Sequence, residues 1–237
     1  MTLVAATGDI HSPRYLNLLI AAAGSWRGDE PCMVLLAGDL VEKGRAEAFS
    51  PAFKLLREKF SGSVFVGVFG NEDWNREAMV KLYPEVVWLD DSVFTGDCSG
   101  GTVAVVGSTG ALDRLTPWQR RNMPWVLDVF RRRPRVLEGL LREARREADY
   151  VVLLTHYGVA RATIVGEDPR IHPYLYSSAM ERMIARARPD VAVHAHAHNG
   201  KPHALVNGVP VYNVSLPLVK RIVEVRLAGR RRLDAFF

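Results

Sequence analysis

The sequence predicts an α/β fold, in which strands and helices alternate along the chain. Short apolar runs, rich in β-branched residues, recur through the first part of the sequence, and a more polar helical stretch follows each one. These runs are almost continuously apolar, which is typical of strands in a sheet covered on both faces. The alternation indicates right-handed crossover connections. From about residue 86 the pattern changes to short strands around glycine- and aspartate-rich turns, which indicates a meander or hairpin.

The first third of the chain is expected to contain three strand–helix pairs. Ser12 followed by Pro13 is typical of the start of a helix, and Asn75 is expected to cap the third helix. The expected strands are residues 2–7, 32–39 and 63–71, and the expected helices run from 12 to about 23, from about 45 to 60 and from 75 to 83.

The rest of the chain is expected to combine short strands with a mainly helical insertion at about residues 112–148. Pro117 fits the start of one helix, and Pro134 either kinks that helix or starts another. Ser178 and Glu181 have the spacing of a capping box. Strands are expected at residues 86–91, 92–97, 101–108, 150–158 and 190–198, with a hairpin over 203–215 that turns at Asn207–Gly208, and edge or terminal strands at 221–228 and 231–237.

Length and composition are those of a globular protein. The 237 residues are 48% hydrophobic and 24% charged, with no repeat or linker, so we expect a single domain over residues 1–237. No apolar run approaches the roughly 20 residues of a membrane helix, and the N-terminus is expected to be a core strand and not a signal peptide. Cys32 and Cys98 are too few and too far apart for a disulfide framework. A reducing, cytoplasmic location is therefore expected.

The chain is basic, with a net charge of +5 and 25 arginines among its 31 basic residues. Such a surface could steer an anionic substrate or bind nucleic acid. The alternative is surface ion pairing in a heat-adapted protein, which the single glutamine, Gln119, supports weakly. We favour ion pairing over nucleic-acid binding.

Polar residues follow five of the expected strands, at the edge where open α/β sheets bind ligands. Carboxylate, imidazole and amide groups suit divalent Mn, Fe, Zn or Ni. Two such ions that share one carboxylate would activate a bridging hydroxide for in-line phosphoryl displacement, with the ions roughly 3.5–4 Å apart. The residues at the five strand ends are Asp9 and His11, Asp39, Asn71, His156, and the histidines of the segment 194–198.

Histidines are concentrated in residues 193–203, which hold four of the seven in the chain. On an extended chain His194, His196 and His198 face the same side. One interpretation of this segment is therefore a metal site at the carboxyl end of a strand. Taken alone it is equally well a histidine-rich surface loop.

The order of these residues resembles the calcineurin-like metallophosphoesterase superfamily, whose signature is D-x-H, G-D, G-N-H-D, a histidine and G-H-x-H. The resemblance runs from Asp9 to His198. It implies a four-layer α/β/β/α sandwich of two mixed β-sheets flanked by helices. It also implies a binuclear metal-dependent phosphoesterase, in which a metal-bridging hydroxide attacks a phosphodiester or an activated phosphomonoester of a small substrate.

The resemblance also assigns the ligands of two ions, for which we favour manganese. Asp39 would bridge the two ions. His194 falls outside the H-x-H pair, and we favour a buried structural histidine over a supporting role behind the ligands. His172 is expected to be a loop residue, and His203 lies outside the pattern. The first ion would be held by Asp9, His11, Asp39 and His198, and the second by Asn71, His156 and His196.

The chain departs from the signature at two positions. Ala195 replaces a glycine, which requires an ordinary backbone angle there. Glu72 replaces the histidine that assists the leaving oxygen, and a carboxylate repels phosphate unless it is protonated or binds metal. Some phosphodiesterases of the superfamily lack that histidine as well. We therefore hypothesise a phosphodiesterase, or a phosphatase for good leaving groups, with Glu72 as an acid. Asp73 is expected to orient a neighbouring residue.

Two other functions are compatible with the resemblance. One is a protein-interaction scaffold, as in the retromer subunit of this superfamily, but all seven ligand types are present here. The other is a nuclease, as among the double-strand-break repair relatives, although the chain leaves little room for their extra segments. Residues 112–134 are rich in arginine and tryptophan, which suggests either a nucleotide-binding cap or an amphipathic helix with its tryptophans buried. We favour the amphipathic helix.

Overall fold

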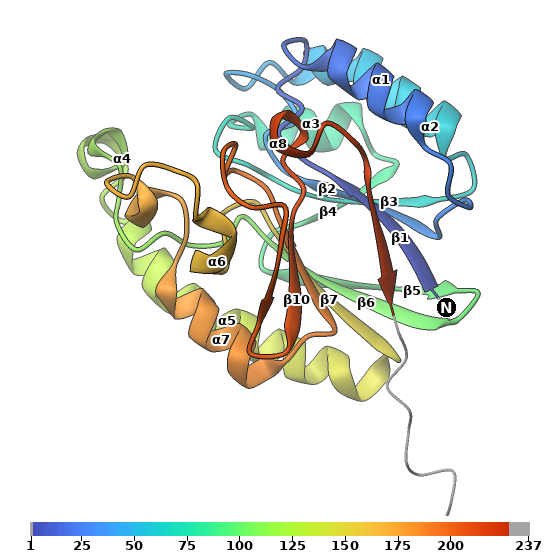
Figure 1. Ribbon diagram of the computed structural model, residues 1–237. Helices are drawn as coiled ribbons and strands as arrows, with labels where there is room; N and C mark the ends of the chain where they lie inside the picture. The colour runs from blue at the N-terminus through green and yellow to red at the C-terminus, as the bar shows by residue number, and fades with distance from the viewer. Residues whose placement is uncertain (1, 228–237) are drawn as a thin grey trace, which may run out of the picture.

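The chain folds into two β-sheets that pack face to face, with helices on both outer surfaces (Figure 1). This computed structural model describes residues 2–227. One sheet has the strand order β11-β1-β2-β3-β4, and the other has the order β5-β6-β7-β8-β10-β9. Both sheets are mixed, because β11 pairs antiparallel to β1 and β5 pairs antiparallel to β6 within otherwise largely parallel arrangements. The four-layer α/β/β/α sandwich that the sequence predicts is therefore confirmed.

Alternation along the strands divides the apolar residues among three cores. In β1 (Thr2–Thr7), Ala5 faces the helices α1 and α2, while Val4 and Ala6 face the second sheet. The central core lies between the sheets, and the third core lies between the second sheet and the helices α5 and α7. Because each sheet is covered on both faces, its strands are apolar on both faces too.

The first sheet is built from the expected strand–helix units. Its strands are β1, β2 (Met33–Ala37), β3 (Val64–Val68), β4 (Val86–Leu89) and β11 (Val223–Leu227). The helices along it are α1 (Leu16–Ser25), the short 3₁₀ helix η1 (Ala46–Phe49), α2 (Ser50–Lys59) and α3 (Arg76–Leu82).

The second sheet begins at β5, one strand after the sequence pattern changes at about residue 86, because β4 still pairs with β3 in the first sheet. Its strands are β5 (Ser92–Cys98), β6 (Gly101–Ser108), β7 (Tyr150–Thr155), β8 (Val191–His194), β9 (His203–Val206) and β10 (Val209–Asn213). The helical elements of this half are α4 (Pro117–Asn122), α5 (Val126–Glu147), α6 (Arg161–Ile164), η2 (His172–Tyr174), α7 (Ser178–Ala187) and α8 (Leu216–Val219).

Local sequence signals placed some helix ends correctly and others wrongly. Asn75 caps α3, and its side chain accepts the N–H of Ala78 at 3.2 Å. The prediction that Ser12 caps a helix is wrong, since α1 begins at Leu16 and the Ser12 hydroxyl donates to the carbonyl of Ala48 at 2.5 Å. These outcomes differ because the Ser12 hydroxyl finds a partner far along the chain.

The remaining predictions concern the start of α7, the effect of Pro134 and the last strand. Ser177, and not Ser178, caps α7, while the carboxylate of Glu181 accepts the N–H of Arg161. Pro134 neither lies in the helix that begins at Pro117 nor starts a new one, because α4 ends at Asn122 and α5 continues through Pro134. The strand expected at 231–237 lies outside the described residues.

The helical insertion corrects the favoured interpretation of its tryptophans. Residues 112–148 contain α4 and α5, and α5 is amphipathic, with Phe130 and Leu137 buried. Trp118 and Trp125, however, are 60% and 61% exposed. The expectation of buried tryptophans is therefore wrong, because buried aliphatic residues and Phe130 fill the inner face of the insertion instead.

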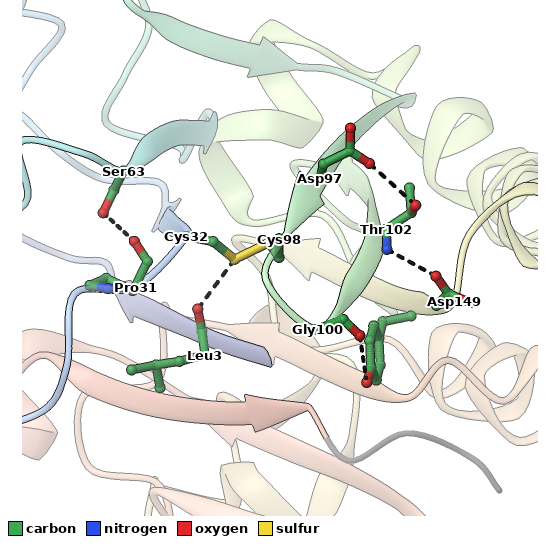
Figure 2. Close-up of a disulfide and its surroundings, with 10 residues drawn as sticks. Leu3, Pro31, Cys32, Ser63, Asp97, Cys98, Gly100, Thr102 and Asp149 are labelled. Carbon is green, nitrogen blue, oxygen red and sulfur yellow. Dashed lines mark hydrogen bonds between the residues drawn. A yellow bond between two sulfur atoms is a disulfide. The ribbon is translucent and has the colours of Figure 1, made fainter. Parts of the chain in front are cut away.

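A disulfide joins the two sheets, which the sequence did not predict. Cys32 directly precedes β2 and Cys98 ends β5, and the two residues are 66 positions apart (Figure 2). The two cysteines were not expected to form a disulfide framework, but the fold brings their strands, which belong to separate sheets, together at this point. The cysteines therefore give no argument for a reducing compartment, and the cytoplasmic location stays a prediction. Within residues 2–227, no helix is long and apolar enough to cross a membrane.

Candidate metal centre

The expected ligands all lie just beyond the carboxyl ends of central strands in the two sheets. In the first sheet, β1 leads to Asp9 and His11, while β2 and β3 lead to the other two ligands on that side. In the second sheet, β7 and β8 lead to the histidines. Since the sheets pack face to face, these loops meet at one end of the molecule. The remaining ligands are Asp39, Asn71, His156, His196 and His198.

The side chains form two adjoining clusters, each able to hold a metal ion. Asp9, His11 and His198 form the first cluster, with one ligand atom of each residue within 4.8 Å of the others. The second cluster satisfies the same criterion and consists of Asp39, His156 and His196. Each cluster takes residues from both sheets, so the site depends on how the sheets pack together.

Asp39 lies between the two clusters. Its Oδ2 atom is 3.7 Å from Nε2 of His11, in the first cluster, and 3.5 Å from Nε2 of His156, in the second. The N–H of Glu72 donates to Oδ1 of Asp39 at 2.7 Å and so fixes the carboxylate. Asp39 is therefore placed to share its carboxylate between two ions.

Several residues around the clusters have left-handed backbone conformations, which residues other than glycine rarely adopt. Asp9, His11, Asp39 and His196 all have positive φ angles, between 42° and 71°. Non-glycine residues in this region cost roughly 1 kcal/mol or more each, and they gather at functional sites. Here the four residues with this conformation come from three loops, and all four belong to the two clusters.

Gly38 in the G-D motif and Gly70 in the G-N motif allow the loops after β2 and β3 to contact each other. A Cβ atom on Gly70 would lie 2.1 Å from Oδ1 of Asp39, and one on Gly38 would lie 2.6 Å from the nitrogen of Gly70. Ala195, which replaces the glycine of the superfamily signature, has no positive φ angle. Its methyl group lies against Gly8, where an added Cβ would be 2.7 Å away. The substitution is therefore accommodated by the absence of a side chain at Gly8.

Hydrogen bonds to carbonyl groups orient two of the histidines. Nδ1 of His156 lies 3.0 Å from the carbonyl oxygen of Ala37, so Nε2 carries the free lone pair, and this atom faces Asp39 and Asn71. Nε2 of His196 lies 3.3 Å from the carbonyl oxygen of Tyr174, which leaves Nδ1 as its ligand atom. Such outer contacts fix the tautomer of metal-ligating histidines.

Two buried polar atoms in the clusters have no hydrogen-bond partner among the described residues. They are Oδ1 of Asp9 and Nε2 of His11. A buried polar atom without a partner is costly, and a bound cation would satisfy both of these atoms. The donor set of carboxylates, imidazoles and one amide suits divalent transition ions, so the residues fit a binuclear centre.

Burial and close charges shift the pKa values of the clusters in opposite directions. Burial first of all, together with the carboxylates of Asp73 and Asp9, raises the pKa of Asp39 well above its usual range. Burial lowers the pKa of His156 to about 3, and so keeps this ligand neutral. For His198, burial is the largest cause and opposes protonation, but the hydrogen bond to the Asp9 carboxylate, the charge of that carboxylate and the charge of Glu167 together outweigh burial and raise the pKa. Since a histidine must be neutral to bind a metal, protonation of His198 competes with metal binding at the first cluster.

Asn71 and Glu72 occupy different surroundings although they are adjacent. Oδ1 of Asn71 lies 3.1 Å from Nε2 of His156, so the amide belongs to the second cluster. The side chain of Glu72 instead turns to the loop after β2, where Oε2 accepts the N–H of Lys43 at 2.8 Å. The backbone of Glu72 supports Asp39, and its carboxylate is held against this loop.

Asp73 is a positioning residue and is completely buried. Its Oδ1 accepts the N–H groups of Leu40 and Val41 at 3.0 and 3.2 Å, and its Oδ2 accepts that of Gly70 at 2.8 Å. Burial raises the pKa of Asp73 to about 6, although these hydrogen bonds act against the shift. Asp73 thus ties the Asp39 loop to the Asn71 loop, and its role in the reaction stays a prediction.

The remaining histidines lie outside the clusters. His194 is fully buried; its Nε2 lies 2.7 Å from the hydroxyl of Thr163, and its Nδ1 lies 2.7 Å from the carbonyl oxygen of Ala195. Both ring nitrogens are therefore used, as expected of a structural histidine. His172 lies in the loop before α7, with its Nε2 3.1 Å from the carbonyl oxygen of Glu167.

His194→Gln is expected to make the free energy of unfolding less dependent on pH below neutrality. Burial lowers the pKa of His194 from 6.5 to about 4, so its contribution to stability is present above pH 6.5 and is lost as the pH falls towards 4. Between pH 7 and pH 5 the free energy of unfolding should therefore fall by about 2 kcal/mol more in the wild type than in the variant. Urea unfolding of chelator-treated protein across this range measures the difference.

The matched control for this experiment is His203→Gln, which removes an exposed histidine. Its curve should run parallel to that of the wild type. Equal slopes for wild type and His194→Gln would show that the buried imidazole does not govern the acid response.

Sequence reasoning missed several residues that support the clusters. The ring of Tyr157 packs against the rings of His156 and His196, with centroids 5.2 and 4.9 Å away. Its position directly after a ligand in the segment "THYG" was the available signal. The roles of Thr163 and of the Tyr174 carbonyl depend on contacts between distant loops, for which the sequence carries no local pattern.

The two-sheet sandwich and the two adjoining Asp/His clusters are those that the resemblance to metal-dependent phosphoesterases implies. The chain belongs to the calcineurin-like phosphoesterase family, whose model matches residues 2–200. No curated protein sequence matches this chain.

Solved structures share the fold at low sequence identity. The chain is similar to phosphopantetheinyl hydrolase (PptH) from Mycobacterium tuberculosis, with 16% identity, 94% of this chain and 95% of that chain covered, and a TM-score of 0.69. It is also similar to a 5'-nucleotidase precursor from Thermus thermophilus, with 12% identity and a TM-score of 0.53. That match covers 95% of this chain and 51% of the other. At these identities the likeness establishes the fold alone.

Proposed function

We propose that this protein is a binuclear phosphoesterase that hydrolyses phosphodiesters, or phosphomonoesters with good leaving groups, with manganese as its metal. The observation that carries the proposal is the position of Asp39. Its Oδ2 lies within 3.7 Å of a histidine from each cluster, which is the arrangement of a carboxylate shared by two ions.

Each cluster would hold one ion with ligands from both sheets. When bound, two divalent ions supply positive charge to the phosphoryl oxygens and lower the pKa of a bound water. The protein's own contribution is to fix the ligands in advance, because Asp39 is held by the N–H of Glu72 and Asp9 by the N–H of His196 at 2.8 Å. Preset ligands need no reorganisation during the reaction.

The preference for diesters or activated esters follows from the position of Glu72. In this chain no histidine stands there, and the carboxylate accepts the N–H of Lys43. A group that donates a proton to the leaving oxygen is typically worth about 10²–10⁴-fold, and esters with poor leaving groups depend on it most. The chain therefore favours esters whose leaving group needs little protonation.

The proposal is tested by measuring bound metal and hydrolysis on the purified protein. Elemental analysis should find two divalent ions per chain, manganese among them when it is supplied. With Mn²⁺, bis-p-nitrophenyl phosphate should be cleaved with a higher kcat/KM than p-nitrophenyl phosphate. Absence of metal together with absence of turnover on both esters would reject the enzyme and favour a protein-interaction scaffold.

Glu72→His is expected to raise kcat on alkyl phosphodiesters by about tenfold or more, because it restores a proton donor near the leaving oxygen. The effect on bis-p-nitrophenyl phosphate should be much smaller, since its leaving group needs no proton. The ratio of kcat values for the two esters is the measurement. The control is Glu77→His, which places a histidine at an exposed position on α3. An unchanged or lower kcat on alkyl esters in the Glu72 variant would contradict this account.

A further inference from the structure

We propose that the segment Arg114–Arg135, named the Trp/Arg surface, binds single-stranded nucleic acid beside the metal centre. This inference concerns binding, and it rests on the proposed function because a nucleic-acid strand is a polymer of phosphodiesters; its alkyl leaving groups are those that the carboxylate of Glu72 is expected to disfavour in hydrolysis. It depends on exposed tryptophans, unpaired arginines and a direct structural connection to the site.

Two indole rings lie uncovered on the Trp/Arg surface. Trp118 on α4 and Trp125 just before α5 are 60% and 61% exposed. Flat aromatic faces of this kind stack with nucleic-acid bases, and each stacked base contributes about 1–3 kcal/mol. The only other large apolar side chain exposed between residues 111 and 140 is Val136, which is about three helical turns beyond Trp125. A membrane-inserting surface would present aliphatic side chains beside its tryptophans, so the composition favours bases over lipid.

The charge of the Trp/Arg surface complements a phosphate backbone. Residues 114–135 contain seven arginines and a single acidic residue, Asp128, which pairs with Arg131 at 3.4 Å. Guanidinium groups without a partner are available for phosphate oxygens. The exposed arginines of this segment whose side chains make no ion pair or hydrogen bond within residues 2–227 are Arg114, Arg120, Arg121 and Arg135.

A chain of contacts fixes the Trp/Arg surface against the second cluster. Gln119, next to Trp118, completes the capping box of α4 with Thr116, and its Nε2 donates to the hydroxyl of Tyr157 at 3.5 Å. The ring of Tyr157 in turn packs against His196. Figure 1 shows α4 at the end of the molecule away from the N-terminus.

A second connection runs through the backbone of the residues that precede α4. The N–H of Arg114 donates to the carbonyl of Pro173 at 2.9 Å, and the next residue, Tyr174, contacts His196 through its own carbonyl. The Trp/Arg surface is therefore held in place and adjoins the ligands. Two tryptophans and four free cations exceed what one nucleotide can engage, so the occupant is a strand of several nucleotides.

The test measures binding of a short fluorescein-labelled oligothymidylate by anisotropy, in EDTA so that no cleavage occurs. The wild type should bind, and Trp118→Ala/Trp125→Ala should weaken binding by at least about tenfold through lost stacking. Arg120→Gln/Arg121→Gln should make the logarithmic salt dependence shallower by about 1.4, the expectation for two phosphate contacts on a single strand. The charge-matched control, Lys59→Gln/Arg146→Gln, changes exposed cations at the C-terminal ends of α2 and α5, outside residues 114–135, and should bind like the wild type.

Several outcomes would overturn the inference. They are absence of oligonucleotide binding by the wild type, equal affinity of the folded tryptophan variant, and equal losses in the arginine variant and its control. If the protein sediments with anionic lipid vesicles and does not bind the oligonucleotide, the surface binds a membrane, and the inference of nucleic-acid binding is rejected. Hydrolysis of bis-p-nitrophenyl phosphate by the wild type is measured separately. If hydrolysis persists without oligonucleotide binding, only the inference fails. If binding is normal and no ester is cleaved, the proposed function fails.

Discussion

Asp39→Asn is expected to lower kcat/KM for bis-p-nitrophenyl phosphate by about 10³-fold, the largest functional effect of any single change. The carboxylate lies between histidines of both clusters, so its loss weakens both metal sites at once. A metal centre supplies several kcal/mol of charge stabilisation, and each 1.4 kcal/mol corresponds to a factor of about ten in rate. The amide is nearly isosteric with the carboxylate, so Oδ1 can still accept the N–H of Glu72. The kinetics should be measured together with bound metal.

Asp97→Asn is the matched control for this substitution, since it makes the same change at an exposed carboxylate on β5. It should retain wild-type kcat/KM and metal content. If Asp39→Asn kept both ions and full activity, the shared carboxylate would not be part of the reaction, and the binuclear assignment would have to be abandoned.

Reduction of the Cys32–Cys98 disulfide is expected to lower the free energy of unfolding by about 4 kcal/mol. The bond closes a loop of 66 residues, and the chain-entropy model gives a stabilisation of this size for such a loop. Urea unfolding with and without a phosphine reductant measures the effect. The Cys32→Ala/Cys98→Ala variant should match the reduced wild type and should not respond to the reductant. Equal stability of oxidised and reduced wild type would show that the bond contributes nothing to folding.

The sequence predicted the sandwich and the clusters well because both depend on local patterns. Apolar runs define strands, and polar residues such as Asp39 and His156 directly follow those runs, where parallel strands place them at one edge. The glycines at positions 38 and 70 belong to the same short motifs, and the structure shows that a side chain at either position would collide with the neighbouring loop.

Features that depend on distant contacts were not predictable in the same way. Cys32 and Cys98 are distant in sequence and belong to different sheets, so no spacing rule pairs them. On α4 the side chain of Gln119 contacts the distant Tyr157, whereas the neighbouring Trp118 is exposed, and no local pattern distinguishes the two positions. Likewise, Ser12 has the composition of a helix cap but donates to a carbonyl in η1.

The disulfide and the clusters fasten the same pair of sheets at opposite ends. Cys32 lies before β2 and Asp39 lies after it, so one covalent bond and one set of ligands bracket the length of this strand. The covalent fastening does not depend on bound ions, and it keeps the two halves of each cluster facing each other when the ions are withdrawn. The protein can therefore be stripped by a chelator and reloaded with a different metal without passing through the unfolded state.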